Sequence, residues 1–256
     1  MDNIHLQKNE EISTHYRDQS GVKSEISRID KYYAFNEILK LVNFEKEFLY
    51  TCKGLLLQPG KIINEYIHFD RSKITNPITF LLLSSVIYTV ITHFFKTDAI
   101  YSEFFKKTYG KTTLTNIYIW TQENLGYANL FMILPLTLWI KILFRKHKYN
   151  IYEVMVLLSL VMGFGTLLFS LESIFDYFFP QYFLLNNYVM TGISFLYLSW
   201  AIADFFGRSF KNFVKSFIAY ILGFFTLQVV IVLTAILIDR FFLEWLIISI
   251  NSYDVI

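Results

Sequence analysis

The feature that most constrains this chain is a series of five long apolar blocks from which charged residues are nearly absent. The first extends from Pro77 to Phe95, and the others occupy residues 125–144, 154–171, 182–203 and 216–238. A block of roughly 18 or more apolar residues is long enough to cross a hydrocarbon core of about 30 Å as a helix. A membrane β-barrel would instead alternate apolar and polar residues in short segments. We therefore expect an all-α polytopic membrane bundle with five transmembrane helices.

The composition supports a membrane protein and excludes several other classes. Charged residues make up 17% of the chain, whereas soluble domains carry about 25%. The net charge is only +2 and the basic residues form no single basic face, so nucleic acid is not an expected partner. Cys52 is the single cysteine and no Cys/His cluster has zinc-ligand spacing, so we predict no disulfide, metal or cofactor. The expected partners are membrane lipids, with another membrane protein or self-association as further candidates.

The chain divides into four parts. Residues 1–33 are polar and carry too little apolar content to fold alone, which is typical of a flexible N-terminal tail. They contain no cleavable signal peptide, so we expect the first span to be retained. Residues 34–76 are predicted to be cytoplasmic amphipathic helices beside the membrane, and residues 77–240 to be the transmembrane bundle. Residues 241–256 are too short to span and are expected to be an interfacial C-terminal segment.

The segment before the first span has the pattern of two amphipathic helices. Apolar residues recur at i+7 through residues 36–57, which predicts the first helix. Pro59 and Gly60 then end it, because proline disfavours helical geometry in the preceding residue and glycine permits a turn. Residues 61–69 would form the second helix. We expect both to lie on the membrane surface or to pack on the cytoplasmic end of the bundle. A partner-binding groove is the rarer alternative.

Basic residues near the ends of the blocks predict the orientation. The positive-inside rule places the N-terminus in the cytoplasm and the C-terminus outside. The connection 96–124 also carries lysines that would face outward, which is compatible with the rule because longer loops obey it less strictly. The basic residues that set the orientation are Lys61, Arg71, Lys73, Lys141, Arg145, Lys146, Lys148, Arg208, Lys211 and Lys215.

Four carboxylates at the ends of the spans are candidates for function. Glu172 and Asp176 stand four residues apart near the outer end of the third span, so a helix places them on one face. Such a pair in a partly dry setting suits a proton relay or a cation site, and a solvated helix end is the plainer alternative. Glu153 and Asp204 begin the third span and end the fourth. We expect them to pair with nearby Lys and Arg residues, and a headgroup site or gate is the alternative.

Uncharged polar residues also occur inside the spans. They should turn inward and hydrogen-bond to another helix, and structural bonding is commoner for such residues than ligand binding. Gly163, Gly165 and Pro135 are compatible with helix breaks around a substrate, but close packing and an ordinary proline kink produce the same residues. The polar residues are Asn129, Asn186, Asn187, Gln228 and His93.

No enzymatic signature is present: the sequence contains no Walker-type loop, no G-x-S-x-G and no H-E-x-x-H. The preferred interpretation is a non-enzymatic membrane protein with an accessory, scaffold or regulatory role. The alternative is a small transporter or channel whose path is lined by the polar residues and the Glu172/Asp176 pair. A membrane-embedded lipid enzyme is the least supported, because it would need a pocket that brings two carboxylates together with a base or metal.

Residues 55–82 read L-L-L-Q-P-G-K-I-I-N-E-Y-I-H-F-D-R-S-K-I-T-N-P-I-T-F-L-L. This stretch resembles the signature of a bacterial integral-membrane family catalogued as domain of unknown function 3667. Its pattern is a leucine-rich helix end, Pro-Gly, a short helix ending in Tyr-Ile, an arginine, and Asn-Pro at the first span. The matching positions are Pro59, Gly60, Tyr66, Arg71, Asn76 and Pro77.

The similarity continues through residues 126–129, 139–144, 152–165 and 200–202 and so covers most of the chain beyond about residue 35. Two departures matter. The four-cysteine zinc ribbon that opens many members is absent, and Phe69-Asp70 replaces the family's common Gly-Lys. The resemblance implies a multi-pass protein of the bacterial inner membrane and no particular activity.

Overall fold

The computed structural model describes residues 45–253, with side chains described as far as Phe241. The predicted tail at 1–33 and the first part of the predicted amphipathic segment lie outside the described residues. Every regular element within the described range is helical. The elements are a helix over residues 45–57, then α2 (Pro59–His68), α3 (Pro77–Phe94), α4 (Thr97–Tyr109), α5 (Thr113–Glu123), α6 (Leu125–Leu143), α7 (Ile151–Phe178), the 3-10 turn η2 (Pro180–Tyr182), α8 (Phe183–Phe205) and α9 (Phe210–Tyr253).

Five of these helices are long and apolar enough to cross a membrane, which confirms the expected all-α polytopic class. The spans are Pro77–Phe94, Leu125–Leu143, Ile151–Phe178, Pro180–Phe205 and Phe210–Phe241. The third is longer than the sequence predicts because α7 continues past the end of its apolar block. Two of the candidate carboxylates therefore lie within the helix.

Helix α9 has 44 residues, or about 66 Å at 1.5 Å per residue, which exceeds the hydrocarbon core. Its backbone continues without a break through the segment predicted to be interfacial, as far as Tyr253. Residues 254–256 lie outside the described range. The interfacial placement of 241–256 remains a prediction.

Side-chain caps explain where several helices begin. The Asn76 side chain accepts a hydrogen bond from the amide of Ile78, and Pro77 occupies the first turn of α3, where its missing N–H costs nothing. Asn150 and Glu153 form a reciprocal capping box at the start of α7, with Asn150 N donating to Glu153 Oε2 (2.6 Å) and Glu153 N donating to Asn150 Oδ1 (2.9 Å). The spans α3 and α7 therefore start at positions fixed by local chemistry.

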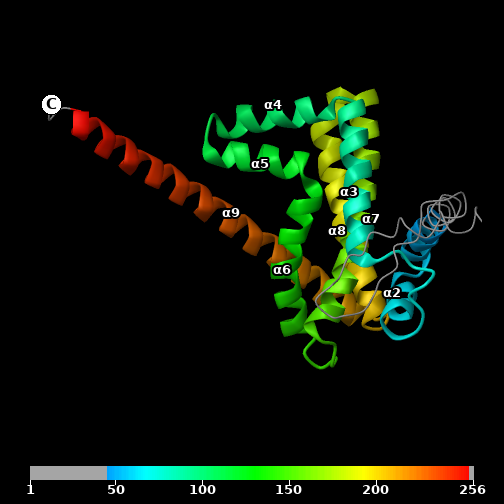
Figure 1. The fold of residues 1–256 in the computed structure, drawn as a ribbon. Helices are drawn as coiled ribbons and strands as arrows, with labels where there is room; N and C mark the ends of the chain where they lie inside the picture. The colour runs from blue at the N-terminus through cyan, green and yellow to red at the C-terminus, as the bar shows by residue number, and fades with distance from the viewer. Residues whose placement is uncertain (1–44, 254–256) are drawn as a thin grey trace, which may run out of the picture. The chain divides into compact units, whose positions relative to one another are not determined.

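The core of the bundle is the packing of α3 against α7, flanked by α6, α8 and α9 (Figure 1). Gly163 allows the close approach of α3, because a Cβ at this position would lie 2.7 Å from the Phe80 ring and 3.1 Å from Leu81 Cα. Small residues at helix contacts are typical of membrane bundles. Gly163 thus supports the packing interpretation over the helix-break alternative.

The connection over residues 96–124 folds into a helical hairpin made of α4 and α5. Figure 1 shows it across the end of the bundle where α3 and α7 terminate. Lys96 enters α4 in the left-handed region (φ 55°), and Gly110 supplies a second positive φ (71°) at the turn between the helices. α5 then packs against α9. The hairpin covers this end of the molecule with polar and aromatic side chains.

The helix over residues 45–57 and α2 are packed on the opposite end of α7 and α8. Leu55 and Ile63 are fully buried in the common core. The Tyr197 hydroxyl donates to the Leu55 carbonyl (3.1 Å), and the Gly60 amide donates to Asp204 Oδ2 (3.0 Å). These contacts join the amphipathic segment to the ends of two spans.

The close approach of α2 to α8 requires glycine at position 60. A Cβ at Gly60 would lie 2.4 Å from the Asp204 carbonyl oxygen and 2.8 Å from the Phe205 amide nitrogen, and neither backbone atom can move without displacing α8. The reactivity of Cys52 can be used as a probe of this packing, because burial raises the pKa of its thiol to about 11. The thiolate is the reactive form, so Cys52 should react slowly with maleimide near neutral pH.

We predict that Gly60→Ala separates α2 from α8 and destabilises the protein by about 1–3 kcal/mol, the usual cost of overpacking. The melting temperature should fall, and Cys52 should react faster with N-ethylmaleimide because the thiol becomes solvated. Gly192→Ala is the matched control, because nothing lies within 4 Å of a Cβ at that glycine. Equal labelling rates in the two variants would contradict the proposed reason for the Pro-Gly pair.

Candidate functional site

Two buried carboxylates lie at the end of α7 that faces the α4–α5 hairpin. Glu172 and Asp176 are 1% and 0% exposed. The Tyr101 hydroxyl, which comes from α4, lies between them, 3.1 Å from Glu172 Oε1 and 3.4 Å from Asp176 Oδ2. The helical spacing predicted from the sequence thus places both carboxylates on one face, and a tyrosine from the hairpin is within hydrogen-bond distance of both.

Two asparagines of α8 complete the set of donors. Asn187 Nδ2 donates to Glu172 Oε1 (3.0 Å), and Asn186 Nδ2 donates to Asp176 Oδ1 (3.0 Å). We call these five residues the carboxylate cluster. It joins α4, α7 and α8 through polar contacts near one end of the bundle.

The donors in the carboxylate cluster are all neutral. Burial, with a smaller contribution from the nearby Glu172 carboxylate, raises the pKa of Tyr101, so its hydroxyl keeps its proton and remains a donor. Over residues 45–241, no Lys, Arg or His makes an ion pair with either carboxylate. A carboxylate buried in this way is expensive unless it is protonated or faces a positive charge. The described residues therefore supply no positive charge to the cluster.

A polar cavity of about 260 Å³ adjoins the cluster. Glu172 and Asn187 form part of its wall, together with aromatic rings, amides and hydroxyls from α3 to α9. Among its described lining residues there is no Lys, Arg or His. The lining residues are Tyr88, Tyr101, Tyr118, Thr121, Gln122, Leu125, Ala128, Asn129, Met132, Met162, Phe169, Glu172, Asn187, Thr191, Phe195, Tyr220, Phe224, Leu227, Gln228 and Ile231.

The amides predicted to turn inward do so around this polar cavity. Asn129 Nδ2 on α6 donates to Thr166 Oγ1 on α7 (2.8 Å), and the Tyr118 hydroxyl on α5 donates to Gln228 Oε1 on α9 (2.7 Å). Each bond joins two helices, as expected for polar side chains in a membrane bundle. The structure thus brings Asn129, Asn187, Gln228 and Glu172 into the wall of one space.

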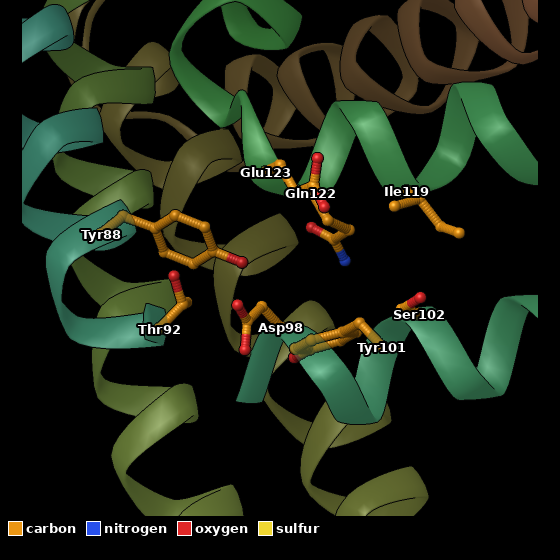
Figure 2. A pocket seen from close by; sticks show the side chains of 8 residues that line it. All are labelled: Tyr88, Thr92, Asp98, Tyr101, Ser102, Ile119, Gln122 and Glu123. Carbon is orange, nitrogen blue, oxygen red and sulfur yellow. The ribbon is translucent and has the colours of Figure 1, made fainter. Parts of the chain in front are cut away.

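A smaller cavity of about 20 Å³ lies next to the polar cavity, between α3 and the hairpin, and Figure 2 shows its walls. It shares Tyr88, Tyr101 and Gln122 with the larger space. Tyr88 is only 4% exposed, and Figure 2 shows its hydroxyl directed into the cavity. Within the described chain this hydroxyl makes no hydrogen bond, although buried polar groups are nearly always paired. A bound water or ligand atom would give it a partner.

Two other candidate carboxylates have local structural roles at the opposite end of the bundle. Glu153 closes the capping box of α7. Asp204 pairs with Arg208 (3.0 Å) and accepts the Gly60 amide. Ion pairing is therefore observed for Asp204, whereas Glu153 bonds to its own helix start because its position at the helix N-terminus favours that partner. Neither lines the polar cavity.

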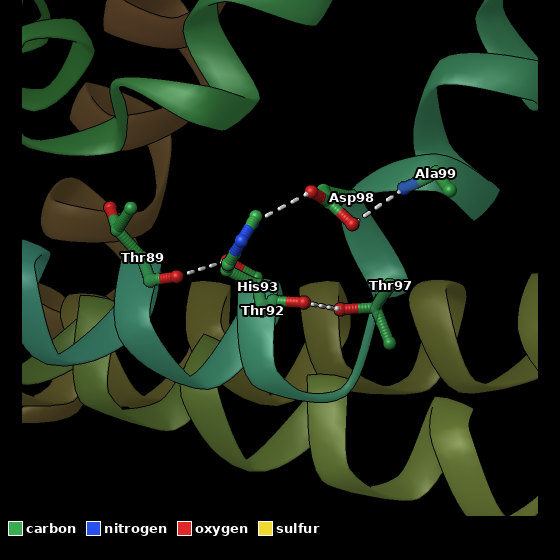
Figure 3. A network of polar contacts seen from close by, with 6 residues as sticks. All are labelled: Thr89, Thr92, His93, Thr97, Asp98 and Ala99. Atoms are coloured by element: carbon green, nitrogen blue, oxygen red, sulfur yellow. Dashed lines mark hydrogen bonds and ion pairs between the residues drawn. The ribbon is translucent and has the colours of Figure 1, made fainter.

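His93 points away from the bundle instead of into it. Its side chain is 86% exposed, and its Nδ1 lies 3.4 Å from Asp98 Oδ2 at the turn between α3 and α4 (Figure 3). Thr97 Oγ1 reaches back to the Thr92 carbonyl (3.4 Å) in the same turn. His93 was expected to face inward because it lies in an apolar block. It is exposed because it lies in the last turn of α3, beside the polar hairpin.

The signature residues hold the turn between α2 and α3. Arg71 Nε donates to the Tyr66 carbonyl (3.1 Å), and its guanidinium lies 5.4 Å from the centre of the Tyr66 ring. The Ser72 amide donates to Asp70 Oδ1 (2.9 Å), and this bond lowers the pKa of Asp70 below its ordinary value. Asn76 and Pro77 then start the first span. The signature residues therefore have a structural role at the start of the first span, and they lie apart from the carboxylate cluster.

The tyrosines of the site were not identified from the sequence. Tyr88, Tyr101 and Tyr118 are three of 18 tyrosines in the chain, and two of them lie in a segment expected to be a connection. No spacing distinguishes them, because their proximity to Glu172 depends on how the hairpin folds back over the bundle. The paired carboxylates and the amides inside the spans were the local signals for this site.

We predict different stability effects for substitutions of two buried tyrosines. Tyr101→Phe removes the hydroxyl shared by Glu172 and Asp176 and should cost about 2 kcal/mol, as for a hydrogen bond to a charged group. Tyr88→Phe removes a hydroxyl with no described partner and should be nearly neutral. Thermal unfolding of both variants in one detergent measures the difference. A loss of stability in Tyr88→Phe equal to that in Tyr101→Phe would contradict the hydrogen-bond assignment.

No curated protein and no solved structure matches this chain. A family model matches residues 45–89, which include the helix over residues 45–57, α2 and most of α3. All the signature residues lie in this range. The match confirms the resemblance predicted from them: over residues 45–89 the chain is similar to the family described as Protein of unknown function (DUF3667).

Proposed function

We propose that this integral membrane protein is a small transporter that binds an organic ammonium ion in the polar cavity. The observation that carries the proposal is the buried Glu172/Asp176 pair, which has neutral hydrogen-bond donors and an adjoining cavity without basic side chains. The fold and the family match support an integral membrane protein of unknown activity. The transport role is the part of the proposal that neither the fold nor the family match tests.

The chemistry of the cavity wall favours an organic cation. A protonated amine would supply the positive charge that the carboxylate cluster lacks and could donate hydrogen bonds to Glu172. The rings of Tyr88, Tyr101, Tyr220 and Phe224 present π faces and edges to the same space, and aromatic side chains stabilise ammonium groups through cation–π interactions. The volume of about 260 Å³ suits a small molecule.

A bare metal ion and a hydrolytic reaction fit the site less well. Divalent cations such as Ca²⁺ prefer six or more oxygen ligands, and residues 45–241 contain no group of three or more His, Cys, Asp and Glu residues placed to hold a metal. A lipid enzyme would need a base or metal beside the two carboxylates. The described lining residues offer tyrosines and amides instead.

The proposed orientation places the site near the outer surface. With the N-terminus in the cytoplasm, α7 runs outward, and Glu172 and Asp176 lie near its outer end beneath the hairpin. An ammonium ion would enter from outside past the α4–α5 hairpin. The basic residues at the other end of the bundle support this orientation. The bacterial inner membrane is the proposed location.

We predict that Glu172→Gln combined with Asp176→Asn lowers uptake of radiolabelled ethylamine into proteoliposomes at least about tenfold, because a buried charge partner is lost. Glu103→Gln is the control, since it makes the same chemical change at an exposed position of α4. The double variant should retain a cooperative melting transition because amides can replace the carboxylate acceptors. Uptake that survives in the folded double variant would remove the proposed role of the pair.

The accessory or scaffold role remains a second proposal, and one observation favours it. The amphipathic segment buries one face in the bundle yet leaves apolar side chains exposed on the other, including Leu49 (67%), Leu56 (55%) and Phe69 (84%). This face could contact lipid or another membrane protein.

Leu49→Gln combined with Leu56→Gln should then reduce chemical crosslinking of the protein to another membrane protein in its native membrane, because the apolar contact surface becomes polar. Ethylamine uptake by purified protein should stay unchanged. Unaltered crosslinking in the variant would count against the accessory role.

A further inference from the structure

An apolar groove of about 570 Å³ lies between α5, α6 and α9, next to the polar cavity. Its lining is aliphatic and aromatic apart from three threonines. Pro135 lines the groove. Because proline has no amide N–H, it cannot donate the usual helical hydrogen bond to the carbonyl of Phe131, which is another lining residue. The lining residues are Ile117, Trp120, Thr121, Ala128, Phe131, Leu134, Pro135, Thr226, Leu227, Val230, Ile231, Thr234 and Ile238.

The groove and the polar cavity meet along four residues that line both. These are Thr121, Ala128, Leu227 and Ile231. Two of them have small side chains: Thr121 lies near the end of α5, and Ala128 lies in the first turn of α6. An elongated molecule could therefore lie in both spaces at once, with a polar end toward Glu172 and an apolar end between α6 and α9.

We propose that the ligand of the site is a single-chain amphiphile with an ammonium headgroup. The headgroup occupies the polar cavity beside Glu172 and the unpaired Tyr88 hydroxyl, and the chain occupies the apolar groove. This inference rests on the proposed ammonium site and narrows its ligand class. It follows from the adjacency of two spaces of different chemistry, one lined by the Glu172 carboxylate among amides and hydroxyls and the other almost wholly apolar.

Two other occupants are possible chemically and give different results in a test. Bulk lipid chains would fill the groove without any connection to the charge in the cavity. A short water-soluble amine would fill the cavity without using the groove. A variant that obstructs only the groove distinguishes these cases from an amphiphile that uses both.

Val230 provides such a variant, because it lines the groove and does not line the polar cavity. Val229 is its neighbour on α9, is exposed to nearly the same extent (54% against 53%) and lines neither space. Val230→Trp should obstruct the chain, whereas Val229→Trp adds the same bulk on a face directed elsewhere. Matching melting temperatures of the two variants would show that both fold.

The test measures binding of ethylamine, dodecylamine and dodecanol to the full chain in phosphatidylcholine nanodiscs by calorimetry, with the heat of empty discs subtracted. Val230→Trp should weaken dodecylamine binding about tenfold relative to Val229→Trp, because the chain loses packing contacts. Ethylamine should bind equally to both variants. Glu172→Gln with Asp176→Asn should weaken both amines and leave the dodecanol signal unchanged.

The two proposals fail in different ways. Equal dodecylamine binding to the Val230 and Val229 variants, or equal weakening of both amines by Val230→Trp, would overturn the amphiphile inference. With either of these results, loss of ethylamine binding in the double carboxylate variant would still support the ammonium site. Binding of both amines that is insensitive to the double variant would overturn the ammonium site and the inference with it.

Discussion

The hydrogen bonds from Tyr101 to Glu172 and Asp176 are the interaction on which the hairpin end of this structure depends. They connect the hairpin to α7, while Asn186 and Asn187 connect α7 to α8. In an apolar bundle the hydrophobic effect does not choose between helix arrangements, because lipid chains are as apolar as leucine. Polar contacts of this kind therefore help to specify where the hairpin lies, together with the packing of Tyr101 and Phe104 on the Phe183 ring. Tyr101, Glu172 and Asn187 also line the polar cavity.

The opposite end of the bundle is specified by a different set of contacts. The Gly60 amide bonds Asp204, and the absence of a Cβ at Gly60 lets α2 approach the backbone of α8. Between the two ends, Gly163 brings α3 against α7 closely enough for the Phe80 ring to pack on it. The amphipathic segment, the central helix pair and the hairpin are thus positioned by a few small or polar residues. The many apolar residues supply packing contacts but little choice of geometry.

The sequence predicted the parts of the fold that depend on local composition. Charge-free blocks gave five spans, and the i,i+4 spacing of Glu172 and Asp176 placed both on one helix face. The hairpin could not be predicted, because α4 and α5 bury only a few residues each, such as Tyr101 and Thr115, and their positions depend on contacts with distant helices. The cavity was beyond prediction for the same reason. Its walls combine residues from α3 to α9, and their proximity is a property of the tertiary packing.

The carboxylates of the bundle differ in how their charge is compensated, and this difference separates two pairs of residues. Asp204 has Arg208 and a backbone amide, and Glu153 has the first turn of its own helix. Both are satisfied by the protein itself and need no further partner. Glu172 and Asp176 are more deeply buried, receive hydrogen bonds from neutral donors, and adjoin a space large enough for a ligand. Because a membrane interior penalises an uncompensated charge, a proton or a bound cation would stabilise this pair. In the proposed transporter, an ammonium ligand that replaces the proton would link binding at the site to proton release.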